Sequence, residues 1–235
     1  MADLVPPHGG GELNALLLPT AERPAAIASA SDLLHVPMSS REVSDTLMLA
    51  MGAYTPITGF MGVSDCHSVC EDMKLSNGIF WPIPITLSCE RSLVELVELG
   101  DEVALTDGES GEILALMRVE EVFIPDRKLE CKHVFGTTDG DHPGVKSVLD
   151  QPEFNLAGPV VCLSEGVYPS EYPDLYLRPE QSRALFIEKG WSQVTAFQTR
   201  NPMHRSHEYL TKIAIEITDG VFIHQVLGKL KPGDI

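Results

Sequence analysis

The chain has 235 residues, 43% of them hydrophobic, and a formal net charge of −17. This composition suffices to bury the core of one large domain or two smaller ones, and it argues against a chain that is disordered throughout. No apolar run approaches the roughly 20 residues of a membrane span, and the N-terminus lacks the basic start and apolar stretch of a signal peptide, so we expect a cytoplasmic protein without a membrane partner.

The negative charge is unevenly distributed along the chain. Residues 171–235 contain 8 acidic and 8 basic residues, so the whole excess lies in residues 1–170. Proteins that grip a nucleic-acid backbone do so through a basic surface. We therefore expect no nucleic-acid partner, and we expect any anion site in the last part of the chain.

The five cysteines are scattered and lack the paired Cys-x-x-Cys spacing of a zinc or redox site. We expect them to be reduced and structural. Cys66 and Cys70 could share a helix face, but a closed metal site needs two more ligands, and none is near them in the sequence. No protein-bound metal is predicted.

The first part of the chain is expected to combine a helix with several short strands. Residues 1–23 are rich in Gly, Pro and Ala and are predicted to be irregular. Residues 40–52 carry apolar residues at helical spacing behind a serine N-cap candidate and end at a glycine, which predicts a helix. Apolar runs broken by Gly, Pro and Asp predict strands at residues 80–87, 102–106, 112–123 and 158–163. Short strands at this spacing indicate a small β-barrel or folded sheet.

The pattern changes at residues 168–173, where two prolines interrupt both periodicities and predict a linker. Beyond it we expect a helix opened by Pro179 and stopped by Gly190, then a strand at residues 194–197. A second helix from Pro202 to about residue 219 and a strand at residues 221–226 follow, and residues 231–235 are predicted as loop. Alternating strands and helices imply a parallel α/β sheet, which is incomplete in these residues.

The turn at residues 198–201 occupies the place where open parallel sheets bind ligands, between a strand's carboxyl end and a helix. Asn201 as N-cap and Pro202 as first helical residue predict a helix N-terminus whose free amides and dipole favour an anion. Arg200 adds a permanent charge and a planar fork that suits tetrahedral oxyanions. Gln198 adds an amide donor.

Two histidines follow this turn at positions 204 and 207, and their spacing predicts that they share one helix face and one ligand. Zinc-protease helices instead carry His-Glu-x-x-His, whereas here Glu208 comes after the second histidine, so a metal hydrolase is disfavoured. His224, on the next expected strand, either faces the same crevice or packs in the unit. The other histidines are predicted to be structural or surface residues: His8, His35, His67, His133 and His142.

The run from Gln198 to Glu208 resembles the Gln-x-Arg-Asn and His-x-x-His signatures of ATP sulfurylases. The resemblance extends over nearly the whole chain, because further segments are similar to the amino-terminal domain of that family. These are residues 52–61 (GAYTPITGFM), 81–87 (WPIPITL), 100–105 (GDEVAL), 136–146 (GTTDGDHPGVK) and 155–159 (NLAGP).

The resemblance implies an α+β region followed by α/β. A β-rich PUA-like domain would span residues 1–168, and a truncated Rossmann-like nucleotidyltransferase domain would span residues 169–235. By the resemblance, the catalytic residues are Thr199, Arg200 and Asn201, and the sulfate-binding residues are Gln198 and Arg200. The ATP-binding set comprises Gln198, Thr199, Arg200, Asn201, His204 and His207, and His224 is a further candidate left open above.

The implied reaction is attack of sulfate on the α-phosphorus of ATP, with Mg²⁺ bound to the ATP, to give adenosine 5′-phosphosulfate and pyrophosphate. The resemblance also implies a homo-oligomer at full length. The family's later Gly-Arg-Asp-His-Ala-Gly loop does not occur in these 235 residues, so we expect this chain alone to be inactive. Three alternatives remain open: a related nucleotidyltransferase with another acceptor, an RNA-binding module, and a non-catalytic packing partner. The sequence leaves open the physiological direction of the reaction.

Overall fold

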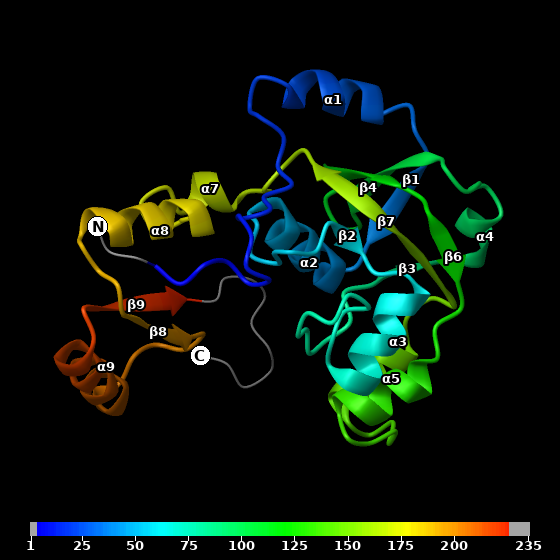
Figure 1. The fold of residues 1–235 in the computed structure, drawn as a ribbon. Helices are drawn as coiled ribbons and strands as arrows, with labels where there is room; N and C mark the ends of the chain where they lie inside the picture. Colours follow the sequence, from blue (N-terminus) through cyan, green and yellow to red (C-terminus); the bar gives the residue numbers. More distant parts are fainter. Residues whose placement is uncertain (1–3, 226–235) are drawn as a thin grey trace. The chain divides into compact units, whose positions relative to one another are not determined.

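The structure is a computed structural model that describes residues 4–225. These residues form two compact units (Figure 1). One unit comprises residues 7–178, and the other comprises residues 179–225 together with residues 4–6. No helix among the described residues is long and apolar enough to cross a membrane.

The first unit is built on a mixed sheet in the order β1-β4-β5-β7-β2, with β3 and β6 also paired to β7. β4 and β5 form an antiparallel hairpin, and β1 pairs with β4 in parallel. The strands are β1 (His35–Met38), β2 (Gly59–Phe60), β3 (Leu87–Cys89), β4 (Glu102–Asp107), β5 (Ile113–Arg118), β6 (Glu121–Phe123) and β7 (Phe154–Cys162). The expected folded sheet is therefore confirmed.

Strand β7 pairs with four other strands, and at Gly158 its backbone lies very close to the backbone at Arg118. This glycine has φ 154°, and a Cβ there would collide with the carbonyl oxygen of Arg118. Residues before Gly158 pair with β3 and β6, and residues after it pair with β5. Only glycine tolerates both this backbone conformation and this approach.

The helix expected at residues 40–52 is confirmed as α2 (Ser40–Ala50). Ser39 is its N-cap, and the Glu42 carboxylate accepts a hydrogen bond from the Ser39 amide at 2.8 Å, which completes a capping box. Several shorter helices were not expected from the sequence. They are α1 (Arg23–Ala30), α3 (Val63–Asp72), α4 (Arg91–Val94), α5 (Arg127–Val134), α6 (Pro143–Leu149) and α7 (Tyr168–Glu171).

The core lies on both faces of the β4–β5 hairpin. Val103 and Leu105 of β4 are buried in one cluster with Leu49 of α2, whereas Ala104, between them, clusters with Ala30 of α1. Alternate residues of one strand thus pack against different helices. This explains why β4 is apolar over the three consecutive buried positions 103–105.

Two strand predictions differ from the structure. Residues 80–86 form no strand ladder, and β3 begins only at Leu87, because Pro82 and Pro84 have no N–H to donate to a neighbouring strand. The run at residues 112–123 is divided into β5 and β6. Its break lies where the Val119 amide donates to the Asp101 carbonyl, and β6 then pairs with the first half of β7 whereas β5 pairs with the last.

In place of the expected linker at residues 168–173, the structure has the short helix α7 followed by irregular chain up to Arg178. Glu165, which is buried, binds this segment. Its carboxylate accepts hydrogen bonds from Arg178 Nε at 2.6 Å and from the Tyr176 hydroxyl at 3.2 Å. The division between the two compact units falls between Arg178 and Pro179.

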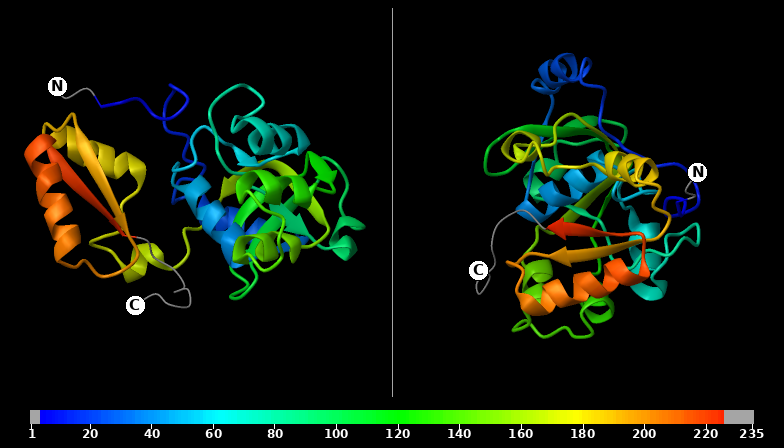
Figure 2. Two further views of the ribbon diagram at one scale, coloured as in Figure 1. Left: turned by 90° about the horizontal axis from the view of Figure 1, so that it is seen from below. Right: turned by 90° about the vertical axis from the view of Figure 1, so that its left-hand side faces the viewer.

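The second unit has the expected order of helix, strand, helix, strand. Its elements are α8 (Pro179–Glu188), β8 (Val194–Thr199), α9 (Arg205–Ile217) and β9 (Gly220–Gln225). β8 and β9 pair in parallel over their whole length, as expected. Figure 2 shows α8 and α9 on opposite sides of this strand pair. The predicted positions Val226 and 231–235 lie outside the described residues.

Candidate functional site

The expected site residues gather where the chain leaves β8 and enters α9. Gln198 and Thr199 are the last two residues of β8, and α9 begins at Arg205. The side chains of Gln198, Arg200, Asn201 and His204 are exposed, and those of Thr199 and His207 are half-buried. The turn thus presents polar side chains to solvent at the carboxyl end of a parallel strand, as an open α/β sheet does with its ligand site.

The predicted helix start was wrong by three residues. Asn201 and Pro202 do not begin α9, because the Thr199 hydroxyl donates to the Asn201 carbonyl at 2.7 Å and accepts from the Asn201 amide at 3.2 Å. This local turn competes with the helical conformation. His204 is extended, with φ −109° and ψ 178°, and serves as the N-cap of α9 in place of Asn201.

The two histidines of the turn lie against each other. Their ring centroids are 3.9 Å apart. His204 Nδ1 accepts from the Ser206 amide at 3.3 Å, and the His204 amide donates to His207 Nδ1 at 3.4 Å. The ring of His207 also packs on Phe197 of β8, at 5.5 Å between centroids. The imidazoles therefore cap the helix, and two amides of its first turn, those of His204 and Ser206, donate to ring nitrogens.

His224 lies on the other face of the strand pair. It is the register partner of Gln198, so the two side chains share a face. His224 stacks on Phe222 with centroids 5.7 Å apart, and Phe222 makes an edge contact with Phe186 of α8. His207, in contrast, packs on the α9 face. The structure places His224 beside Gln198 and not beside the histidine pair.

Two carboxylates of this unit, Glu208 and Asp219, are bound to other groups. The Lys212 side chain donates to Glu208 at 2.6 Å and lowers the pKa of that exposed carboxyl. The pKa of Asp219 is lowered by hydrogen bonds from the Gln193 amide and then from Ser192. Asp219 precedes β9 and so lies at the opposite end of the strands from the turn. Glu208 is thus paired with a lysine, and Asp219 is remote from this end of β8.

Cys66 and Cys70 both lie on α3, and all five cysteines are free. Burial raises the pKa of both thiols, that of Cys70 to about 12. Without a bound metal, both thiols therefore remain protonated near neutral pH. Within residues 4–225, no group of three His, Cys, Asp or Glu side chains is arranged to hold a metal ion.

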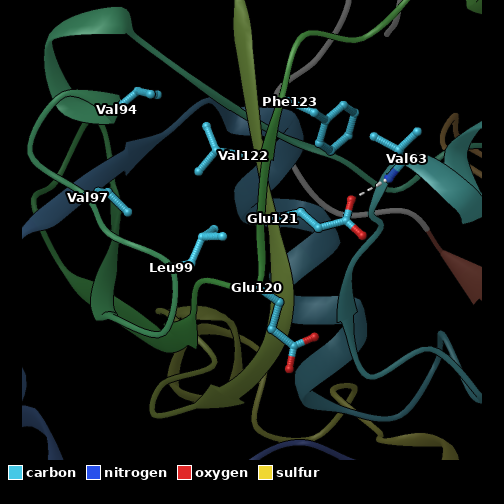
Figure 3. Close-up of a pocket in the computed structure, with 8 residues that line it drawn as sticks. All are labelled: Val63, Val94, Val97, Leu99, Glu120, Glu121, Val122 and Phe123. Atoms are coloured by element: carbon cyan, nitrogen blue, oxygen red, sulfur yellow. Dashed lines mark hydrogen bonds between the residues drawn. The ribbon is translucent and has the colours of Figure 1, made fainter.

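An apolar groove of about 380 Å³ lies in the first unit, beside β6, and was not expected from the sequence (Figure 3). Val94, Val97 and Leu99 form one wall, and Val122 and Phe123 line the groove from β6. Its polar residues are glutamates, one of which accepts a hydrogen bond from the Val63 amide at 2.9 Å. A groove of apolar and acidic side chains offers no side-chain donors to an oxyanion.

Comparison with known proteins agrees with the two-unit structure. The PUA-like domain family matches residues 5–165, and the ATP-sulfurylase family matches residues 173–235. The chain is 53% identical over 235 residues to a protein named sulfate adenylyltransferase from Thiobacillus denitrificans and covers 58% of its length. It is 52% identical over 237 residues to a protein of the same name from Syntrophobacter fumaroxidans, with 100% of this chain and 58% of that protein covered.

A solved structure titled "Hexameric APS kinase from Thiobacillus denitrificans" matches 98% of this chain and 41% of its own, with 30% identity and a TM-score of 0.75. The chain thus spans less than two thirds of the relatives it matches. The expected PUA-like fold of the first part is confirmed. Residues 173–235 match the ATP-sulfurylase family, and through residues 5–165 the chain belongs to the PUA-like domain family.

Proposed function

We propose that this chain forms the amino-terminal part of a sulfate adenylyltransferase, which transfers the adenylyl group of ATP to sulfate. The observation that carries the proposal is the gathering of Gln198, Arg200, His204 and His207 at the carboxyl end of β8. The names of relatives that are about half identical to the whole chain support the same activity. In this proposal, residues 1–168 form an accessory domain and residues 169–235 open the catalytic domain.

In the proposed site the turn binds two anions. Gln198 and Arg200 bind sulfate, since an amide donor and a guanidinium fork match its tetrahedral oxygens. His204 and His207 bind the phosphates of ATP through their outer ring nitrogens. Thr199 and Asn201 complete the catalytic turn through the two hydrogen bonds that join them. His224, beside Gln198 in register, contributes from the other face of the strands.

The proposed chemistry requires alignment more than proton transfer. Sulfate is already ionised near neutral pH, so its oxygen can attack the α-phosphorus without a general base. A bond forms between the sulfate oxygen and the α-phosphorus, the bond to the bridging oxygen breaks, and pyrophosphate leaves with the electron pair. Mg²⁺ enters with ATP as part of the substrate. The protein holds two repelling anions in line and neutralises the growing charge.

The charge distribution supports this assignment. Residues 171–235 are electrically balanced, whereas the rest of the chain carries the whole excess of 17 negative charges. An anion site in the balanced part avoids much of the repulsion that the acidic part would exert. The hexameric APS kinase that the chain resembles supports the further proposal of a homo-oligomer, and we propose a cytoplasmic location on the sequence grounds given above.

A chimera tests the proposed function. Residues 1–235 would be joined to the remaining carboxyl-terminal part of the Thiobacillus denitrificans relative, and pyrophosphate release would be measured. We expect release that requires both ATP and sulfate and that responds to competition by molybdate, while the 235-residue chain alone should release none. A chimera that folds and binds ATP, but whose pyrophosphate release responds to neither sulfate nor molybdate, would point to a nucleotidyltransferase with another acceptor.

A further inference from the structure

We propose that the first turn of α9 fixes both imidazoles of the histidine pair as Nε2–H hydrogen-bond donors, and that Ser206 is the positioning residue that fixes this state for His204. The role of these donors toward ATP phosphates rests on the proposed function. The proton positions themselves rest only on the hydrogen bonds of this turn.

The backbone amides decide where the ring protons lie. An amide N–H can only donate, so each ring nitrogen that it contacts must present a lone pair. The Ser206 amide contacts His204 Nδ1 at 3.3 Å, and the His204 amide contacts His207 Nδ1 at 3.4 Å. In a neutral imidazole one nitrogen accepts and the other carries the proton. The amide contacts therefore favour the Nε2–H tautomer for both neutral rings.

The Ser206 hydroxyl adds a second and shorter contact to the same nitrogen. Its Oγ lies 2.8 Å from His204 Nδ1 and 3.5 Å from Nε2. Since Nδ1 already accepts from an amide, the hydroxyl is the donor in this contact. His204 Nδ1 thus receives two donors from one residue, and a proton on Nδ1 would face both of them. The opposite tautomer is disfavoured by this arrangement.

Ring packing fixes the orientation of the two Nε2–H donors. The rings lie 3.9 Å apart at an interplanar angle of 31°, and Phe197 supports His207 from β8. The Ser206 amide lies at the positive end of the α9 dipole and donates to His204 Nδ1, which makes the Nε2–H of that ring a stronger donor. An oxyanion accepts from such donors and would be repelled by a ring lone pair. The donors of the turn are therefore preorganised for an anion.

The tautomers can be measured in the 235-residue chain itself. The chain would be labelled with ¹⁵N-histidine, and long-range ¹H–¹⁵N correlation spectra would be recorded at alkaline pH, where imidazoles are neutral. His204→Gln and His207→Gln assign the signals. We expect the Nε2–H pattern for both rings. An Nδ1–H pattern for either ring in the unsubstituted chain would overturn the proposal without any need for a folded variant.

Variants at position 206 test the positioning role. We expect Ser206→Ala to shift His204 toward a mixture of tautomers and Ser206→Thr to keep the Nε2–H form, with the His224 signals unchanged as an internal reference. Ser192→Ala, which removes another serine hydroxyl bond in this unit, should leave both rings unaffected. An unchanged His204 pattern in Ser206→Ala would refute the role of Ser206.

The functional part of the inference has a separate readout. In the chimera, Ser206→Ala should raise the KM for ATP about two- to tenfold, as expected for one lost hydrogen bond, and Ser206→Thr should restore it. Tautomers as proposed with an unchanged KM would refute the phosphate role alone. Absence of pyrophosphate release in the unsubstituted chimera would instead count against the proposed function, because the tautomer spectra do not depend on activity.

Discussion

The Thr199 hydroxyl holds Asn201 by two hydrogen bonds, donating to its carbonyl at 2.7 Å and accepting from its amide at 3.2 Å. We expect Thr199→Val in the chimera to lower kcat/KM by about ten- to a hundredfold, because loss of two hydrogen bonds of about 1 kcal/mol each releases the turn that carries Arg200. Thr199→Ser should retain most of the activity. Steady-state kinetics with ATP and sulfate measure the effect, and equal losses in both variants would show that the hydroxyl is not the cause.

Arg200 lies in the middle of this turn and is exposed. Substitution by alanine should abolish pyrophosphate release in the chimera, since the turn loses its permanent charge, and should leave the unfolding temperature almost unchanged. Arg200→Lys should recover only a small part of the rate, because an ammonium group cannot replace the bidentate guanidinium fork. Retained activity in Arg200→Ala would rule out the proposed sulfate role of this residue.

The sequence predicts best the elements whose signals are local. The α2 helix begins at a serine with Glu42 three residues later and ends beside a glycine, and the structure has each of these features. The parallel pair β8 and β9 was likewise predicted from the alternation of strand and helix. For α2 one segment contains all the information, whereas for β8 and β9 the helix that joins them is the signal for parallel pairing.

The remaining differences have specific physical causes. Asn201 and Pro202 form a strong helix-start signal, but a threonine hydroxyl and an imidazole cap compete with it, and such side-chain bonds cannot be ranked from residue types alone. The helices of ten or fewer residues in the first unit depend on tertiary packing. The face occupied by His224 follows from its register with Gln198, which only the folded pair of strands defines.

Asp45 should make the stability of the first unit depend on pH. Burial raises its pKa from 3.8 to about 6, even though Arg41 and the Tyr54 hydroxyl bind the carboxylate. Between these values the folded state keeps a proton that the unfolded state has lost, so the free energy of unfolding falls as pH rises from about 4 to about 6. We expect Asp45→Asn to remove this decrease in the free energy of unfolding, which amounts to up to about 3 kcal/mol over the pH range.

Urea unfolding of the chain and of Asp45→Asn at both ends of that pH range measures this contribution. Asp32, which is exposed, provides the matched control, and Asp32→Asn should leave the slope as it is. If the stability of the unsubstituted chain instead rose between these pH values while Asp45→Asn removed the rise, the carboxylate would be stabilising in its ionised form, and the assignment of a raised pKa would be wrong.

Gly158 allows β7 to pair with β3 and β6 through the residues before it and with β5 through the residues after it. A side chain at this position would collide with the Arg118 carbonyl, and φ 154° strains any other residue. We expect Gly158→Ala to lower the free energy of unfolding of the first unit by about 3 kcal/mol or more, since backbone strain and a displaced strand add together. Gly140→Ala is the control, because a Cβ at that exposed loop glycine meets no atom within 4 Å. Urea unfolding followed by circular dichroism distinguishes the two, and equal stabilities would show that β7 can shift at Gly158 without loss of its pairing.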